Sequence, residues 1–269
     1  MADAGLFICE ALVSGGPRHR DEVELCEDVA GIITFPEGAV FYIADATSDE
    51  GRMGPFSSHY FANSLGFWFL KAGLSEMANG IAAINLDQVF ESALDDLKNA
   101  WQSELSAFMK KPKAEQEIHK VAEPFKSEEG GGWLKVFSTT FCGGVISSAD
   151  RNVRLVRTGD IDLIVKHGGE DVQRKPMRKE RIFVQFIKKE NEEPKFRFPE
   201  LTYEHYAAEE LEYLIVKTDG VSFLNDELTI NALKGCGIED VLKFRRILLK
   251  GITSKGDDKA LLYCAFMNR

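Results

Sequence analysis

Residues 39–46 read AVFYIADA, an apolar run that ends at the carboxylate of Asp45 and its neighbour Ala46. A similar run precedes it at residues 30–35, and Pro36-Glu37-Gly38 separates the two. Val, Ile, Phe and Tyr favour strands, and a Pro followed by a Gly is typical of a turn, so the sequence predicts two strands joined by a short connection. A carboxylate at the end of a buried strand requires an explanation, because burial of an unpaired charge is costly.

Other acidic residues also lie at the boundaries of expected strands. Glu27-Asp28 precedes the strand that begins at residue 29, Asp219 follows a strand at 213–218, and Asp258 precedes a strand at 260–266. Neighbouring strand ends in one sheet bring distant residues together, and clustered carboxylates then repel one another. Divalent cations that prefer oxygen ligands, such as Mg²⁺ and Mn²⁺, relieve that repulsion. The pattern therefore indicates a metal site.

The rest of the chain mixes helical and strand patterns within what we predict to be a single domain, residues 1–269. The segment 112–132 is charged, ends in three glycines and shows little periodicity, so we expect a mobile insertion within that domain. The remaining expected elements are a first strand at 5–13, helices at 57–75, 85–111 and 238–250, and a hairpin of two β-rich runs at 133–148 and 152–166.

Composition narrows the class of protein. The chain has 269 residues with 44% hydrophobic content, enough for a substantial core. Its net charge of -10 argues against a nucleic-acid partner, since such proteins concentrate positive charge. No run reaches the roughly 20 apolar residues that cross a bilayer, and the apolar N-terminal stretch is too short for a signal peptide. We therefore expect a cytoplasmic protein with no membrane association.

The five cysteines are odd in number, widely spaced and without a C-x-x-C pair. Neither a disulfide framework nor a structural zinc site is indicated, and we expect reduced thiols. A separate basic cluster, from Arg174 to Arg181, stands out in an acidic chain. It is interpreted as a solvated face, with a dock for an acidic or phosphorylated substrate as the alternative.

Six short motifs, taken in order, resemble those of the metal-dependent Ser/Thr protein phosphatases of type 2C, in a divergent form of the bacterial type. The strand that ends in Asp45 resembles the family's strand ending in Asp-Gly, and the segment around Glu27-Asp28 resembles its Asn-Glu-Asp segment. The other four are residues 138–140 (STT), 156–160 (VRTGD), 214–221 (LIVKTDGV) and 256–261 (GDDKAL). The resemblance spans nearly the whole chain.

The resemblance implies an α+β fold, an αββα sandwich in which two central antiparallel sheets are flanked by pairs of helices. It also implies hydrolysis of phosphoserine and phosphothreonine by a water activated at two Mn²⁺ or Mg²⁺ ions. A phosphorylated protein would be the substrate, with a partner Ser/Thr kinase or its targets as candidates. The implied metal ligands are Asp45, bridging both ions, the carbonyl of Ala46, Glu27 or Asp28 on one ion, and Asp219 and Asp258 on the other.

The sequence departs from the family pattern at three places. Val23 stands where a phosphate-binding arginine is expected, so Arg20 is our catalytic candidate and Arg18 the alternative. Residues 47–51 replace the usual His-Gly-Gly, and residues 135–137 lack the Asp that helps to bind a third metal in bacterial members. These losses motivate a second hypothesis, an inactive pseudophosphatase that binds or regulates phosphoproteins. A third hypothesis is an acidic α+β binding module without phosphatase ancestry.

Overall fold

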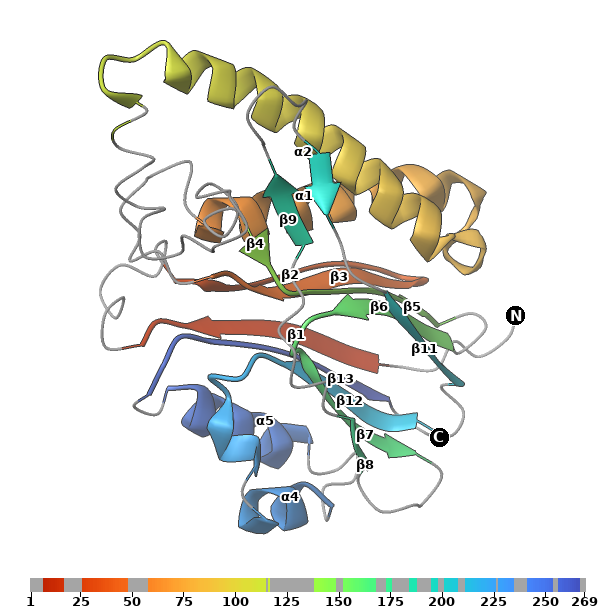
Figure 1. Ribbon diagram of the computed structural model, residues 1–269. Helices are drawn as coiled ribbons and strands as arrows, with labels where there is room; N and C mark the ends of the chain where they lie inside the picture. Colours follow the sequence, from red (N-terminus) through yellow and green to blue (C-terminus); the bar gives the residue numbers. More distant parts are fainter. Residues whose placement is uncertain are drawn as a thin grey trace.

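The computed structural model has two stacked sheets with helices on both outer faces (Figure 1). It describes residues 7–16, 26–47, 58–114, 116, 138–148, 152–167, 173–175, 184–187, 195–197, 201–207, 211–225, 227–234, 241–253 and 256–266.

Sheet B contains the apolar run that ends at Asp45. Its order is β11-β6-β5-β3-β2, and each neighbouring pair is antiparallel. Strand β3 is buried from its first residue to Ala44, as its apolar sequence predicts, because helices cover one face and the second sheet covers the other. The strands are β2 (Asp28–Phe35), β3 (Gly38–Asp45), β5 (Phe141–Ser147), β6 (Asn152–Thr158) and β11 (Thr202–Ala207).

Sheet A has the order β1-β13-β12-β7-β8, again antiparallel throughout. Its strands are β1 (Phe7–Ser14), β7 (Asp162–His167), β8 (Gln173–Lys175), β12 (Leu211–Lys217) and β13 (Lys259–Phe266). A small third sheet has the order β10-β9-β4, formed by β4 (Ser138–Thr139), β9 (Val184–Ile187) and β10 (Lys195–Arg197).

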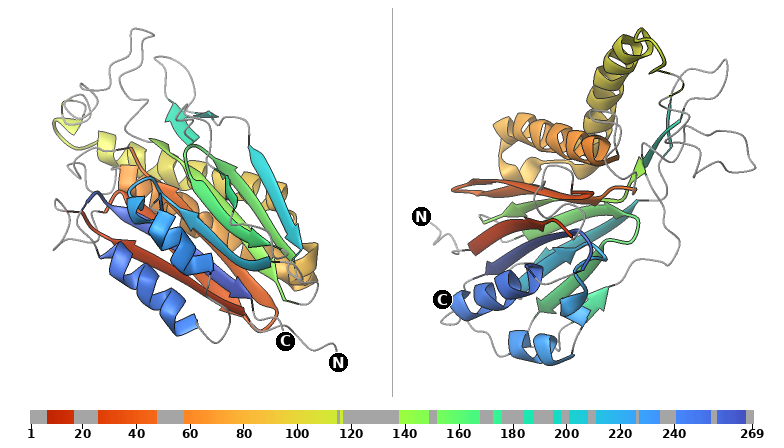
Figure 2. Two further views of the ribbon diagram at one scale, coloured as in Figure 1. Left: turned by 90° about the horizontal axis from the view of Figure 1, so that it is seen from below. Right: turned by 90° about the vertical axis from the view of Figure 1, so that its left-hand side faces the viewer.

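The helices complete four layers. Helices α1 (Ser58–Glu76) and α2 (Leu86–Met109) cover sheet B, and α4 (Glu227–Lys234) and α5 (Val241–Ile252) lie beneath sheet A (Figure 2). Short 3-10 turns occupy Met77–Asn79, Ile81–Ala83 and Ser222–Asn225. One apolar core separates the sheets and another lies under each helical layer. The predicted αββα sandwich is confirmed.

One expected run divides in two. Residues 152–166 were predicted as a single β-rich stretch, but β6 ends at Thr158 in sheet B and β7 begins at Asp162 in sheet A. Gly159 has a φ of 86°, a conformation that residues with a side chain rarely adopt. It lets the chain turn from one sheet into the other.

The expectation of reduced thiols is wrong for two cysteines. Cys9 on β1 and Cys264 on β13 are register partners and form a disulfide, with their Cα atoms 4.2 Å apart. Their sequence separation of 255 residues hid the pairing, which depends on the first and last strands lying side by side. Cys26 and Cys142 are free and buried, and burial raises the pKa of each thiol to about 12.

Among the helices of the described residues, none is long and apolar enough to span a membrane. Most of the segment 112–132 lies outside the described residues, and so does most of the basic cluster between Arg174 and Arg181.

Candidate metal centre

Two carboxylates face each other at one end of sheet B. Strands β2 and β3 are joined by the tight turn after Phe35, so Asp28 at the start of one and Asp45 at the end of the other are register partners. Their side chains share a hydrogen bond. Asp28 is only 3% exposed and Asp45 is half-buried, so the pair is not two ordinary surface acids.

The pair holds protons at unusually high pH. The pKa of Asp28 is raised to about 7, chiefly by burial; its hydrogen bonds to Thr218 and Asp45 oppose the rise, and the charges of Asp219 and Asp258 add to it. Burial, followed by the charges of Asp28 and Asp219, raises the pKa of Asp45 well above its usual range. Two carboxyls in contact cannot both ionise without a counter-charge, so at neutral pH the metal-free pair retains a proton.

Two threonines fix the backbone at Asp45. The Asp45 carbonyl accepts hydrogen bonds from the Thr140 N–H at 2.9 Å and from the Thr139 hydroxyl at 3.0 Å. The Asp45 N–H in turn donates to the Thr140 hydroxyl oxygen at 3.1 Å. The motif at residues 138–140 therefore has a local role, which is to hold the end of β3 and with it the Asp45 carboxylate.

Sheet A contributes Thr218, which reaches across to sheet B. The Thr218 hydroxyl donates to Asp28 Oδ2 at 2.6 Å, and the oxygen of this hydroxyl accepts from the Ala260 N–H at 3.0 Å. Thr218 is 1% exposed, so this link is dry and fixes Asp28 relative to the end of β12. The acid pair is thus held from both sheets.

Asp219 follows Thr218 and is exposed, and its negative charge acts on both members of the pair. Gly220 allows the close turn here, because a Cβ at this position would lie 1.8 Å from the Asp258 carbonyl oxygen. Asp160 sits just beyond the end of β6, and its charge also raises the pKa of Asp45. Sequence reasoning passed over Asp160, although it lies within the motif at 156–160.

The Asp258 carboxylate has backbone partners. Its Oδ1 accepts from the Gly16 N–H at 2.6 Å and its Oδ2 from the Glu27 N–H at 2.8 Å. Glu27 uses its carbonyl to accept from the Ala46 N–H at 3.0 Å. Asp258 therefore links the end of β1 to the start of β2. In both of these hydrogen bonds Glu27 uses its backbone and not its carboxylate. Because side chains alternate along a strand, Asp28 rather than Glu27 shares a face with Asp45.

The donor set of the site fits a hard divalent cation in part. Aspartate oxygens are the ligands that Mg²⁺ and Mn²⁺ prefer, and a cation can replace the proton that the buried pair retains. Within the described residues, however, no three His, Cys, Asp or Glu side chains stand close enough to hold an ion as they lie. A metal would therefore require a further acid, such as Asp219 or Asp160, to come closer to the pair. Arg18 and Arg20 lie outside the described residues, as do residues 48–51.

No family model and no curated protein matches the sequence of the chain. Solved structures do match its fold. Stp1, a serine/threonine phosphatase from Staphylococcus aureus, matches with a TM-score of 0.57 at 14% identity, over 100% of this chain and 98% of that one. The chain has the fold of bacterial type 2C phosphatases.

Two further structures with this fold agree over nearly the whole chain. RsbX, crystallised with magnesium, gives a TM-score of 0.52 at 12% identity, over 97% of this chain and 95% of its own. The type 2C phosphatase domain of SpoIIE from Bacillus subtilis gives 0.52 at 14% identity, over 97% of this chain and 63% of that one. At these identities the type 2C likeness concerns the fold.

Proposed function

We propose that this protein is a metal-dependent phosphatase that hydrolyses phosphoserine and phosphothreonine in proteins. The observation that carries the proposal is the carboxyl pair of the buried Asp28 and the half-buried Asp45, held from both sheets at one edge of a phosphatase fold. Such a pair has no stabilising role that apolar residues would not fill better, since burying two acids costs free energy. A cation site is the purpose that accounts for it.

We assign the metal ligands as Asp45, Asp28 and Asp219, with the carbonyl of Ala46 and the acid Asp160 adding to the set. When bound, a pair of Mn²⁺ or Mg²⁺ ions supplies an activated water and stabilises charge on the phosphoryl group. Glu27 is the alternative to Asp28. The chain's own contribution is to fix the carboxylates through Thr218, Thr139 and Thr140 and to hold the surrounding backbone through Asp258.

Substrate phosphate needs a cation from the protein as well. A guanidinium matches two phosphate oxygens at once, so Arg20 remains our proposed phosphate-binding residue, with Arg18 as the alternative. The partners that fit this activity are phosphorylated proteins, including a Ser/Thr kinase or its targets. We retain a cytoplasmic location as part of the proposal, although the Cys9–Cys264 disulfide is uncommon in a reducing compartment.

The test is turnover of p-nitrophenyl phosphate and of a phosphothreonine peptide, with Mn²⁺, with Mg²⁺ and with excess chelator. The proposal predicts hydrolysis that requires metal and is restored when metal is added back. Full activity in chelator would refute a metal mechanism. If the folded protein shows no activity under any of these conditions, the proposed phosphatase activity is refuted.

A pseudophosphatase is the second candidate, and specific features of the site favour it. Asp219 is exposed and both Asp258 oxygens already accept backbone N–H groups, so the described acids are not arranged as a finished metal cage. Such a protein would bind the phosphothreonine peptide without hydrolysing it. Calorimetry with that peptide, alongside the turnover assay, separates the two functions.

A further inference from the structure

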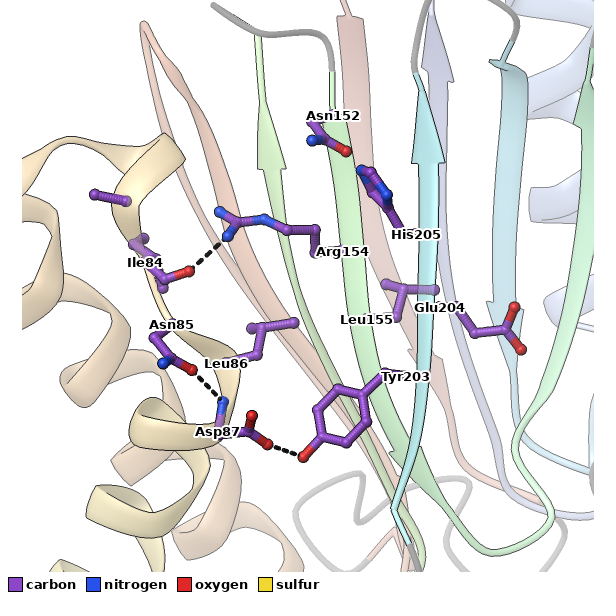
Figure 3. Close-up of a pocket in the computed structure, with 11 residues that line it drawn as sticks. Ile84, Asn85, Leu86, Asp87, Asn152, Arg154, Leu155, Tyr203, Glu204 and His205 are labelled. Atoms are coloured by element: carbon purple, nitrogen blue, oxygen red, sulfur yellow. Dashed lines mark hydrogen bonds between the residues drawn. The ribbon is translucent and has the colours of Figure 1, made fainter.

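A cavity lies at the end of sheet B opposite the candidate metal centre. It measures about 510 Å³ and lies between the start of α2 and the outer face of β6 and β11 (Figure 3). Asn152, which lines it, begins β6, whereas the acid pair lies near the strand's other end. Six residues at about 3.3 Å each place the two ends of β6 roughly 20 Å apart. The cavity is therefore separate from the candidate metal centre.

Arg154 carries a fixed positive charge in this cavity. Its guanidinium donates to the carbonyl of Ile84 at 2.6 Å (Figure 3). It also donates to the carbonyl of Ile81 at 3.0 Å, so it spans the short 3-10 turn before α2. These carbonyls orient the group but do not neutralise it. No carboxylate in the described part of the chain pairs with Arg154, so its charge is available to a ligand.

Two polar side chains lie beside Arg154. His205 on β11 is its register partner, and it is exposed and forms no hydrogen bond with any described residue. Asn152 is two residues before Arg154 on the same face of β6, and it points toward His205 in Figure 3. The Asn152 Oδ1 is buried and has no hydrogen-bond partner among the described residues. A rotation of this amide would offer its NH₂ group instead.

The acids that line the cavity are engaged elsewhere. Asp87 accepts a hydrogen bond from the Tyr203 hydroxyl, away from Asn152 and His205 (Figure 3). Glu204 points away from the cavity and pairs with Arg157 at 2.7 Å. The Asn85 side chain caps α2 by accepting from the Asp87 N–H at 3.0 Å. Arg154 and His205 thus offer donors at one end of the cavity, and Asn152 would do so after rotation of its amide. At the other end, Asp87 is occupied by the Tyr203 hydroxyl.

We propose that Asn152, Arg154 and His205 form a binding site for an oxyanion, a phosphate or carboxylate group. A guanidinium fixed by carbonyls, with an imidazole and an amide beside it, offers hydrogen-bond donors of the kind that bind such groups. The net charge of -10 opposes an anion at long range, but salt screens that field beyond about 10 Å. The local donors then decide binding.

The experiment uses the full chain labelled with ¹⁵N and treated with chelator, so that the candidate metal centre does not bind the anion. Inorganic phosphate, acetate and a phosphoserine peptide are titrated in turn while amide and His205 ring signals are followed. We expect saturable shifts at residues 152–154 and 205. Arg154→Gln and His205→Ala should each weaken phosphate binding about tenfold, the loss expected for a charge-assisted hydrogen bond.

Lys71→Gln is the matched control, because it removes one positive charge from an exposed site on α1. It should leave phosphate affinity unchanged within about twofold. Arg154 also supports the turn before α2, so His205→Ala, an exposed position, keeps the test valid if Arg154→Gln fails to fold. Tighter binding of the peptide than of phosphate would identify a protein ligand, and equal binding a small anion. Shifts confined to the Asp45 region, or equal affinity in every variant, would overturn the proposal.

Discussion

The two ends of strand β6 lead to opposite chemical environments. Beyond Thr158, the chain enters a region where the negative charges of Asp28, Asp160 and Asp219 act on Asp45 and raise its pKa. At its start, Asn152 and Arg154 enter a cavity where a cation lacks a carboxylate partner among the described residues. One sheet can thus hold environments of opposite charge, provided that the length of a strand separates them. Each end can be perturbed independently.

The largest expected effect is at the acidic end. Asp45→Asn keeps the shape of the side chain but removes its charge and its capacity to bridge metals. If the proposed function holds, kcat for p-nitrophenyl phosphate should fall about a hundredfold or more, as when a main electrostatic contribution is lost. Asp95→Asn, an exposed change on α2, is the control. Equal activity in both variants would exclude Asp45 from the chemistry.

Asp219→Asn should act in the same direction. If Asp219 binds the metal as proposed, Mn²⁺ should bind more weakly to this variant and kcat should fall by roughly two orders of magnitude. Without metal, the melting temperature should stay the same or rise, because the repulsion on Asp28 and Asp45 is relieved. Scanning calorimetry with and without Mn²⁺ checks both parts. Parent-like Mn²⁺ binding and turnover would make this ligand assignment wrong.

The link between the sheets should matter for stability. Thr218→Val removes the hydroxyl that donates to Asp28 and leaves a buried acid without that partner. We expect a loss of about 1–3 kcal/mol in the free energy of unfolding, measured by urea denaturation. Thr253→Val, at an exposed helix end, should cost less than about 0.5 kcal/mol. Similar losses in both variants would mean that the Thr218 contact contributes no more to the free energy of unfolding than an exposed hydroxyl does.

The acid pair also predicts a pH dependence of the metal-free protein. Burial raises the pKa of Asp28 from 3.8 to about 7, so between these values the folded chain keeps a proton that the unfolded chain has lost. Stability from this group is therefore present below about pH 4 and declines as pH rises toward 7. Melting curves in chelator should show a decline that Asp28→Asn flattens. An unchanged slope in Asp28→Asn would contradict the assignment.

The smallest effect is expected at the cavity. Tyr203 is 48% exposed and donates to Asp87, and burial together with that carboxylate raises the pKa of the Tyr203 hydroxyl, so the hydroxyl remains a donor. Tyr203→Phe should cost no more than about 1 kcal/mol and leave catalysis unaltered. Chemical denaturation measures the change in stability, and turnover of p-nitrophenyl phosphate measures catalysis. A loss of activity would show that the two ends of sheet B communicate.

The contrast also explains what the sequence could predict. The acids at the end of β6 near Thr158 could be picked out from the sequence because each directly follows or precedes an apolar strand, as Asp45 and Asp219 do. The helices α1 and α2 and the positions of β1, β2, β3, β12 and β13 along the chain were predicted for the same reason, since their apolar patterns are local. Asp160 was missed because a lone acid after a glycine turn resembles any surface loop.

The cavity and the disulfide could not be predicted in this way. Arg154 and His205 are neighbours only because β11 pairs with β6 in one register, and nothing near either residue in the sequence specifies that pairing. Cys9 and Cys264 meet for the same reason, through β1 and β13. The backbone role of Asp258 likewise depends on the approach of Gly16 and Glu27, which lie far away in sequence.

The central claim is that the Asp28–Asp45 pair exchanges its retained proton for a divalent cation. Isothermal titration of Mn²⁺ into the metal-free protein near pH 7, in two buffers of different ionisation enthalpy, measures metal affinity and proton release together. The account predicts saturable binding with release of about one proton, and the loss of both in Asp45→Asn. Binding without proton release, or binding that survives unchanged in Asp45→Asn, would contradict it.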